Sequence, residues 1–115
     1  MDRQEMKERT RAFALRVVKL VQALPRNQMA KVLGNQLLRA GTAVGANYRA
    51  AQRARTAREF DAKLGIVEEE CDETAYWMDL IVKAGLITRD RLSSLLTEAD
   101  ELTAIIVTAR KNSRH

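Results

Sequence analysis

Residues 33–53, LGNQLLRAGTAVGANYRAAQR, decide the fold of this chain because they predict a helix with one unusually flat side. At helical spacing, Gly34, Gly41 and Gly45 fall on one stripe beside an ordinary apolar seam. Each glycine inside a helix costs about 1 kcal/mol relative to alanine, so the three give up about 3 kcal/mol of helix propensity. Close packing of another helix against the flat side must return that energy. This helix is therefore expected at the packed centre of a helical assembly.

The rest of the chain predicts three more helices around this one. Apolar residues recur at alternating spacings of three and four, and the four expected helices span residues 2–24, 28–53, 57–84 and 89–111. The basic residues 110–115 are expected to form a frayed tail. Short connections force neighbouring helices to be antiparallel. The prediction is a single all-α domain over residues 1–115, an antiparallel up-down-up-down four-helix bundle.

Capping signals mark the ends of these helices. Asn27 and Thr56 are typical N-cap residues, and Glu59 has capping-box spacing from Thr56. Gly85 suits the left-handed position that follows a helix, and Thr88 is a candidate N-cap for the last helix.

The net charge of +5 hides a strong asymmetry between the two halves of the chain. Residues 1–58 carry 13 Lys and Arg against 3 acids, or +10, whereas residues 59–115 carry 7 against 12, or −5. The basic half can bind a polyanion such as RNA or DNA, or it can pair with the acidic half of a neighbouring copy. Both alternatives remain open at this point.

Eight basic residues are candidates for contacts with nucleic acid. Guanidinium groups bind phosphates bidentately, and such binding weakens steeply with salt. Tyr48 is the one aromatic candidate for base stacking, so we expect contacts mainly to the backbone, with weak sequence specificity. The alternative is a solvated surface with ion pairs inside the chain. The candidate residues are Arg39, Arg49, Arg53, Arg55 and Arg58, with Arg3, Lys7 and Arg11.

A second candidate surface follows the helix expected at 57–84. Trp77 is flanked by acids on a face beside a complete core seam, which is typical of a subunit interface. The acids would then pair with Arg39 or Arg49 of a neighbouring subunit. Alternatively, Trp77 widens the core of its own bundle. The candidate interface residues are Ile66, Glu70, Glu73, Trp77 and Leu80.

The sequence gives weak signals for catalysis, metals and membranes. The only histidine is His115, so the Glu-x-x-His ligands of di-metal bundles are missing, and no metal or cofactor is expected. Cys71 lies on an apolar seam and is expected as a small buried hydrophobe. The uncharged run at 102–109 is far shorter than the ~20 residues that span a bilayer, and no signal peptide follows Met1. We expect a cytoplasmic, non-enzymatic protein without membrane contact.

Several short motifs together resemble a known bacterial family. They are Leu24-Pro25, QLLRA at 36–40, GANY at 45–48, Glu59-Phe60, Glu70, Glu73-Thr74, YWM at 76–78 and GLI at 85–87. On these motifs the chain resembles, over nearly its whole length, the four-helix-bundle proteins encoded in intervening sequences of bacterial 23S ribosomal RNA genes. One difference is Ala50, at a position where the family usually carries an acid.

The resemblance implies a small up-down bundle that assembles into a homopentameric ring with a basic surface. The accessory protein of diversity-generating retroelements, which works with a reverse transcriptase and nucleic acid, is similar in architecture. The expected partners are therefore other copies of the chain, RNA or DNA, and a protein partner. No enzymatic activity is implied.

Overall fold

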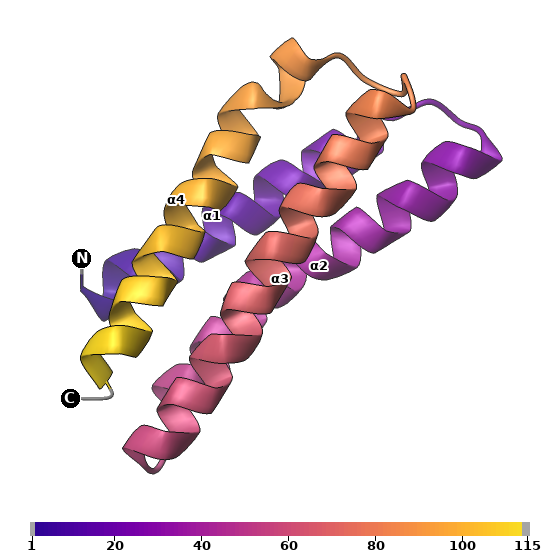
Figure 1. Ribbon diagram of the computed structural model, residues 1–115. Helices are drawn as coiled ribbons and strands as arrows, with labels where there is room; N and C mark the ends of the chain where they lie inside the picture. The colour runs from indigo at the N-terminus through magenta and orange to yellow at the C-terminus, as the bar shows by residue number, and fades with distance from the viewer. Residues whose placement is uncertain (1, 114–115) are drawn as a thin grey trace.

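The computed structural model describes residues 2–113 and shows four helices that run up, down, up and down (Figure 1). They are α1 (Arg3–Gln22), α2 (Gln28–Gln52), α3 (Ala57–Lys83) and α4 (Arg89–Ser113). The bundle measures 46 × 22 × 20 Å, and α1 begins at the same end at which α4 finishes (Figure 1). The predicted all-α four-helix bundle is confirmed, and each observed helix end lies within two residues of its expected position.

Local chemistry sets three helix ends: the starts of α2 and α3 and the end of α3. The side chain of Asn27 accepts a hydrogen bond from the Ala30 N–H at 2.8 Å, which caps α2. Thr56 caps α3 in the same way, with its hydroxyl oxygen 3.0 Å from the Glu59 nitrogen. Gly85 follows α3 with φ = +76°, a left-handed conformation that glycine adopts without a steric penalty.

The two ends of α4 differ from expectation. At its start, the Arg91 N–H donates to the backbone carbonyl of Thr88 at 3.2 Å, and within the described residues the Thr88 hydroxyl oxygen accepts no hydrogen bond from a backbone N–H. At its end, residues 110–113 are helical, so the predicted frayed tail is wrong for them. The reason is Arg110, whose guanidinium lies 3.1 Å from the carboxylates of both Asp61 and Glu68 on α3. Residues 114 and 115 of the expected tail lie outside the described residues.

The glycine stripe of α2 faces α1. A Cβ atom added at Gly41 would lie 2.8 Å from both methyl carbons of Val17, which is fully buried. Added at Gly34, it would lie 3.2 Å from Leu24 Cδ1, and added at Gly45, 3.3 Å from Thr10 Oγ1. The missing side chains therefore let α1 and α2 approach closely, which buries apolar surface and offsets the lost helix propensity.

Polar contacts close the bundle between its first and last helices, which pack less extensively than the other three pairs of adjacent helices. The Arg9 guanidinium binds Glu98 bidentately, with N–O distances of 2.6 and 2.7 Å, and Arg16 donates to the Ser94 hydroxyl at 2.6 Å. The hydrogen bond from Arg9 holds the pKa of Glu98 below its usual value. Glu98 is therefore ionised at neutral pH and ties α4 to α1.

Replacing Gly41 by alanine is expected to destabilise the protein by up to about 2 kcal/mol. Overpacking costs about 1–3 kcal/mol, and the gain in helix propensity returns only about 1 kcal/mol. The stiff, β-branched Val17 cannot move its methyl groups aside. The free energy of unfolding in urea would measure the change. In the control Gly34→Ala, the new methyl would lie 3.2 Å from Leu24 Cδ1 and 3.3 Å from Val21 Cγ1, farther than the 2.8 Å at Gly41, so the loss of stability should be smaller. A Gly41→Ala protein as stable as the wild type would contradict the close packing.

Candidate nucleic-acid interface

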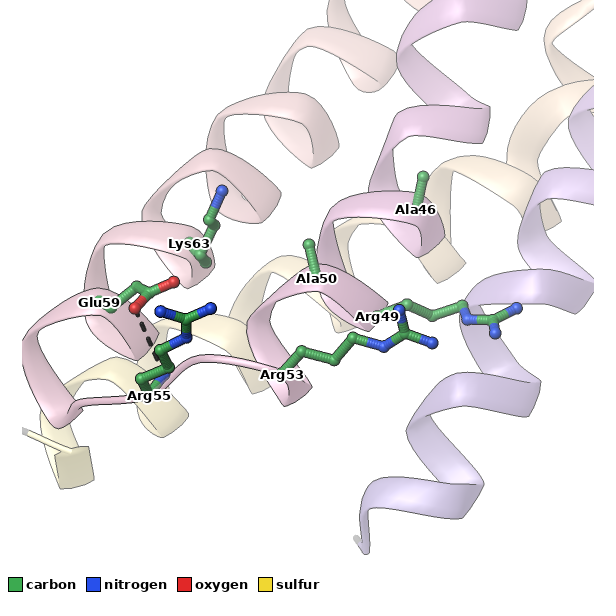
Figure 2. Close-up of a pocket in the computed structure, with 7 residues that line it drawn as sticks. All are labelled: Ala46, Arg49, Ala50, Arg53, Arg55, Glu59 and Lys63. Carbon is green, nitrogen blue, oxygen red and sulfur yellow. Dashed lines mark hydrogen bonds between the residues drawn. The ribbon is translucent and has the colours of Figure 1, made fainter.

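A groove of about 700 Å³ lies between the C-terminal part of α2 and the N-terminal part of α3 (Figure 2). Its lining residues are Ala46, Arg49, Ala50, Arg53, Arg55, Glu59 and Lys63. Ala46 and Ala50 lie one turn apart on α2, and their short side chains form the floor of the groove. Four cations and a single acid surround that floor, which gives the groove a strongly positive potential.

A second groove, of about 450 Å³, lies on the other side of α2, against α1. Its cations are Lys7 and Arg11 from α1 and Arg49 from α2, and Gly45 forms part of its wall. Arg49 and Ala46 line both grooves, so the grooves adjoin along the outer face of α2. We call their six cations the α2 basic surface: Lys7, Arg11, Arg49, Arg53, Arg55 and Lys63.

None of these six side chains forms an ion pair with another residue of the described range 2–113. Arg11, Arg49, Arg53 and Arg55 are exposed, while Lys7 and Lys63 are half-buried. The carboxylate of Glu59 accepts a hydrogen bond from the backbone N–H of Arg55 at 3.3 Å, not from its guanidinium (Figure 2). The guanidinium and ammonium groups of the α2 basic surface are thus open to an external anion.

The structure gathers five of the eight predicted cations on this surface and leaves three outside it. Arg3 lies at the start of α1 and, with Arg55, lines a smaller cavity at the same end of the bundle. Arg58 is exposed in the first turn of α3 but lines neither groove. Tyr48, the predicted stacking residue, is only 7% exposed and belongs to the core. The sequence analysis missed Lys63, although extending the predicted interface stripe by one turn before Ile66 would have found it.

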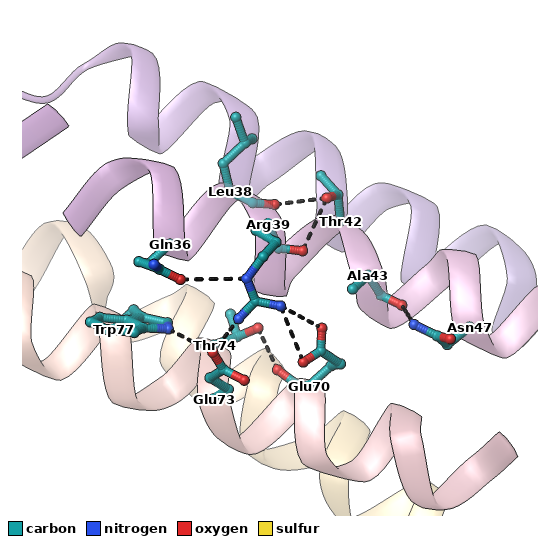
Figure 3. A network of polar contacts seen from close by, with 10 residues as sticks. All are labelled: Gln36, Leu38, Arg39, Thr42, Ala43, Asn47, Glu70, Glu73, Thr74 and Trp77. Atoms are coloured by element: carbon teal, nitrogen blue, oxygen red, sulfur yellow. Dashed lines mark hydrogen bonds and ion pairs between the residues drawn. The ribbon is translucent and has the colours of Figure 1, made fainter. Parts of the chain in front are cut away.

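Arg39, the third residue outside the surface, is engaged within the chain (Figure 3). Its guanidinium lies 3.1 Å from a carboxylate oxygen of Glu70 and also forms an ion pair with Glu73. The Trp77 indole N–H donates to the same Glu73 carboxylate at 3.2 Å. The antiparallel packing of α2 and α3 brings these three groups together in one chain, so Glu70 and Glu73 bind Arg39 of their own chain without a contact to Arg39 of a neighbour.

Burial distinguishes the two acids of this network. The Glu70 side chain is 13% exposed, and desolvation raises its pKa above the usual value, against the opposing effect of the Arg39 charge. The Glu73 side chain is 37% exposed. The charge of Arg39 therefore opposes the effect of burial and favours the ionised form of the poorly hydrated Glu70 carboxylate.

The other candidate interface residues contribute both to the core and to the surface. Trp77 and Leu80 are half-buried and pack against the core, whereas Ile66 remains 39% exposed. Tyr76 is 57% exposed, and its ring meets the ring of Trp77 edge-on at a centroid distance of 5.0 Å. Val32, 53% exposed, lies about two turns before Arg39 on α2, and Trp77 lies one turn after Glu73 on α3. Because the helices are antiparallel and Arg39 pairs with Glu73, Val32 and Trp77 lie at about the same level of the bundle. We call Val32, Tyr76 and Trp77 the apolar edge.

The described residues 2–113 provide no sign of metal chemistry or of a membrane span. No three His, Cys, Asp or Glu side chains in this range come together as a metal site. None of its helices combines the length and the apolar character needed to cross a bilayer. Burial raises the pKa of the Cys71 thiol to about 12, so this side chain is a protonated part of the core.

Replacing Arg39 by methionine is expected to destabilise the protein at pH 7 by about 1–2 kcal/mol, because the poorly hydrated Glu70 carboxylate loses its cation. The expected loss is smaller than for a fully buried pair because the Arg39 side chain is 49% exposed. The pKa of Glu70 then rises further above its unfolded value. A raised carboxyl pKa means that protonation favours the folded state. The loss of stability caused by Arg39→Met should therefore shrink as the pH falls through that pKa. Urea unfolding from pH 7 down to about pH 4 would measure it.

The matched control is the double variant Arg39→Met/Glu70→Gln, which has no titrating group at position 70. Its stability relative to Glu70→Gln alone should not vary over the same pH range. An Arg39→Met deficit that is constant with pH would show that Arg39 does not act through Glu70.

Comparison with known proteins agrees with this architecture. The family described as 23S rRNA-intervening sequence protein matches residues 2–108. A similar solved structure is that of a protein of unknown function from the S23 ribosomal protein family of Bacteroides thetaiotaomicron VPI-5482. It is 33% identical, with a TM-score of 0.89, and the alignment covers 96% of this chain and 99% of that chain. No curated protein matches the chain. The resemblance inferred from the sequence motifs is thus confirmed, and the chain belongs to the 23S rRNA-intervening sequence protein family.

Proposed function

We propose that this protein is a non-enzymatic homo-oligomer that binds the backbone of RNA or DNA through the α2 basic surface. The observation that carries the proposal is the set of six cations that line two adjoining grooves without an ion-pair partner in the described residues. Lys and Arg in such an arrangement neutralise phosphates and release their counterions.

The contrast with the other arginines supports this proposal. Arg9, Arg39 and Arg110 each bind two carboxylates within the chain. Six acids of α3 and α4 therefore neutralise these three arginines, and Glu59 is the one acid among the residues that line the two grooves. The lining of both grooves contains no aromatic side chain, which favours sequence-tolerant contacts with the backbone over base stacking.

The apolar edge supports the oligomeric part of the proposal. Val32 on α2 and Tyr76 on α3 are more than half exposed, and exposed apolar side chains beside polar ones are typical of protein–protein interfaces. The family resemblance suggests five subunits in a ring. The second candidate is a structural or adaptor oligomer, in which the apolar edge binds a different protein and the basic surface binds no nucleic acid.

Binding of labelled RNA and DNA oligonucleotides should weaken by about three orders of magnitude between about 50 and about 200 mM salt if six phosphates are neutralised. Fluorescence anisotropy titrations would give the slope of log K against log salt. The variant Arg49→Gln/Arg53→Gln should reduce that slope by about two, with a similar loss for every sequence tested.

The matched control is Arg91→Gln/Lys111→Gln, which removes the same charge from exposed positions on α4. It should leave the salt slope unchanged. Absence of binding at low salt, or an equal effect of both double variants, would contradict a specific role of the α2 basic surface and favour the adaptor alternative.

Light scattering should give a mass of five 13.0 kDa subunits for the native protein. The variant Val32→Glu/Tyr76→Glu puts two charges on the apolar edge and should dissociate the oligomer, because unpaired charges in an interface are costly to desolvate. Leu15→Glu is the control, since Leu15 is also exposed but lies on α1, away from that edge. A monomeric wild-type protein at micromolar concentration would contradict the oligomer, and an intact Val32→Glu/Tyr76→Glu oligomer would contradict this interface.

A further inference from the structure

The cations of the α2 basic surface stand in two rows rather than one. Lys7 and Arg11 form the outer rim of the α1–α2 groove, and Arg55 and Lys63 form the outer rim of the α2–α3 groove. Arg49 lies on α2 between the rims and lines both grooves. A single phosphate backbone lying in either groove would leave the opposite rim without an anion.

The spacing of the two grooves matches the two strands of a duplex. Packed helices lie about 8–10 Å apart, and one helix with its side chains is about 10–12 Å wide. Two backbones that lie on either side of α2 are thus separated by about the width of one helix. The major groove of B-form DNA is about 12 Å wide and admits an α-helix, whereas the minor groove, at about 6 Å, does not.

The outer face of α2 is shaped for that position. Ala46 and Ala50 have short side chains on this face (Figure 2). Thr42, one turn earlier on α2, is another small residue that lines the α1–α2 groove. From Thr42 to Arg53 the face runs for about 17 Å at 1.5 Å per residue. At 3.4 Å per base pair, that length corresponds to about five base pairs for each subunit.

The chemistry of the lining disfavours other nucleic acids. Single-stranded sites need aromatic platforms for unstacked bases, and neither groove has one. The major groove of A-form RNA is deep and narrow, so it does not admit a helix flanked by two others. From these observations we infer that the α2 basic surface takes double-stranded DNA, with α2 facing the major groove and one strand's phosphates in each flanking groove. The inference rests on the proposed binding function and narrows its ligand.

The first test compares three probes of equal length: a DNA duplex, one of its single strands, and an RNA duplex of the same sequence. For the DNA duplex, six neutralised phosphates predict a salt slope of about −5. For a single strand held in one groove by four cations, the expected slope is about −3. The DNA duplex should also bind more tightly than either other probe at the same salt concentration.

The second test removes one rim at a time. Lys7→Gln/Arg11→Gln removes the rim on α1. Arg55→Gln/Lys63→Gln removes the opposite rim, formed by the α2–α3 connection and α3. Each variant should lower the DNA duplex slope by about two, because the strand that lies along the altered rim loses two phosphate contacts. Thermal unfolding would verify that both variants remain folded, and Arg91→Gln/Lys111→Gln again supplies the control.

The outcomes separate this inference from the proposed function. Equal affinity for single and double strands, tighter binding of the RNA duplex, or an effect of only one rim would overturn the duplex DNA assignment while leaving backbone binding in place. Failure of all three probes to bind at low salt would overturn both.

Discussion

The contact between Gly41 and Val17 sets the distance between α1 and α2, and the candidate site depends on that distance. There is no room for one more methyl group at this point of the interface. The same close approach continues to Gly45, which packs against Thr10 and also forms part of the wall of the α1–α2 groove. A bulkier α2 would push α1 outward and would separate Lys7 and Arg11 from Arg49. The glycines thus serve the packing of the bundle and the shape of its basic surface together.

Electrostatic pairing divides the molecule into a neutralised part and a basic part. Three arginines cross between helices to paired acids: Arg9 joins α1 to α4, Arg39 joins α2 to α3, and Arg110 joins α4 to α3. These contacts contribute to stability because the acids are partly withdrawn from water and bind their cations by charge-assisted hydrogen bonds. The excess positive charge is consequently concentrated where α3 offers only Glu59.

Hydrophobic periodicity and capping signals were sufficient to predict the bundle, because both are local properties of each helix. They could not decide between Arg39 and Arg49, which both lie on α2. The difference depends on the register between α2 and α3: Arg39 lies at the level of Glu70 and Glu73, whereas Arg49, about 15 Å further along the helix, lies at the level of Lys63. Register between helices depends on packing, so single-helix patterns do not contain it. The same limit explains the tail, since nothing local to Arg110 indicates that Asp61 and Glu68 lie beside it.

Distance along α2 also decides whether self-assembly and nucleic-acid binding compete. Val32 of the apolar edge and Arg53 of the basic surface are 21 residues apart, which is about 30 Å along the helix axis. The paired Arg39 network lies between them as an electrically compensated band. An interface at the apolar edge therefore leaves the basic surface exposed, and each added subunit adds a further basic surface. Joined surfaces bind one polyanion with an effective concentration that a single weak site does not reach. Under the proposed function, assembly would strengthen backbone binding without any new contact to the nucleic acid.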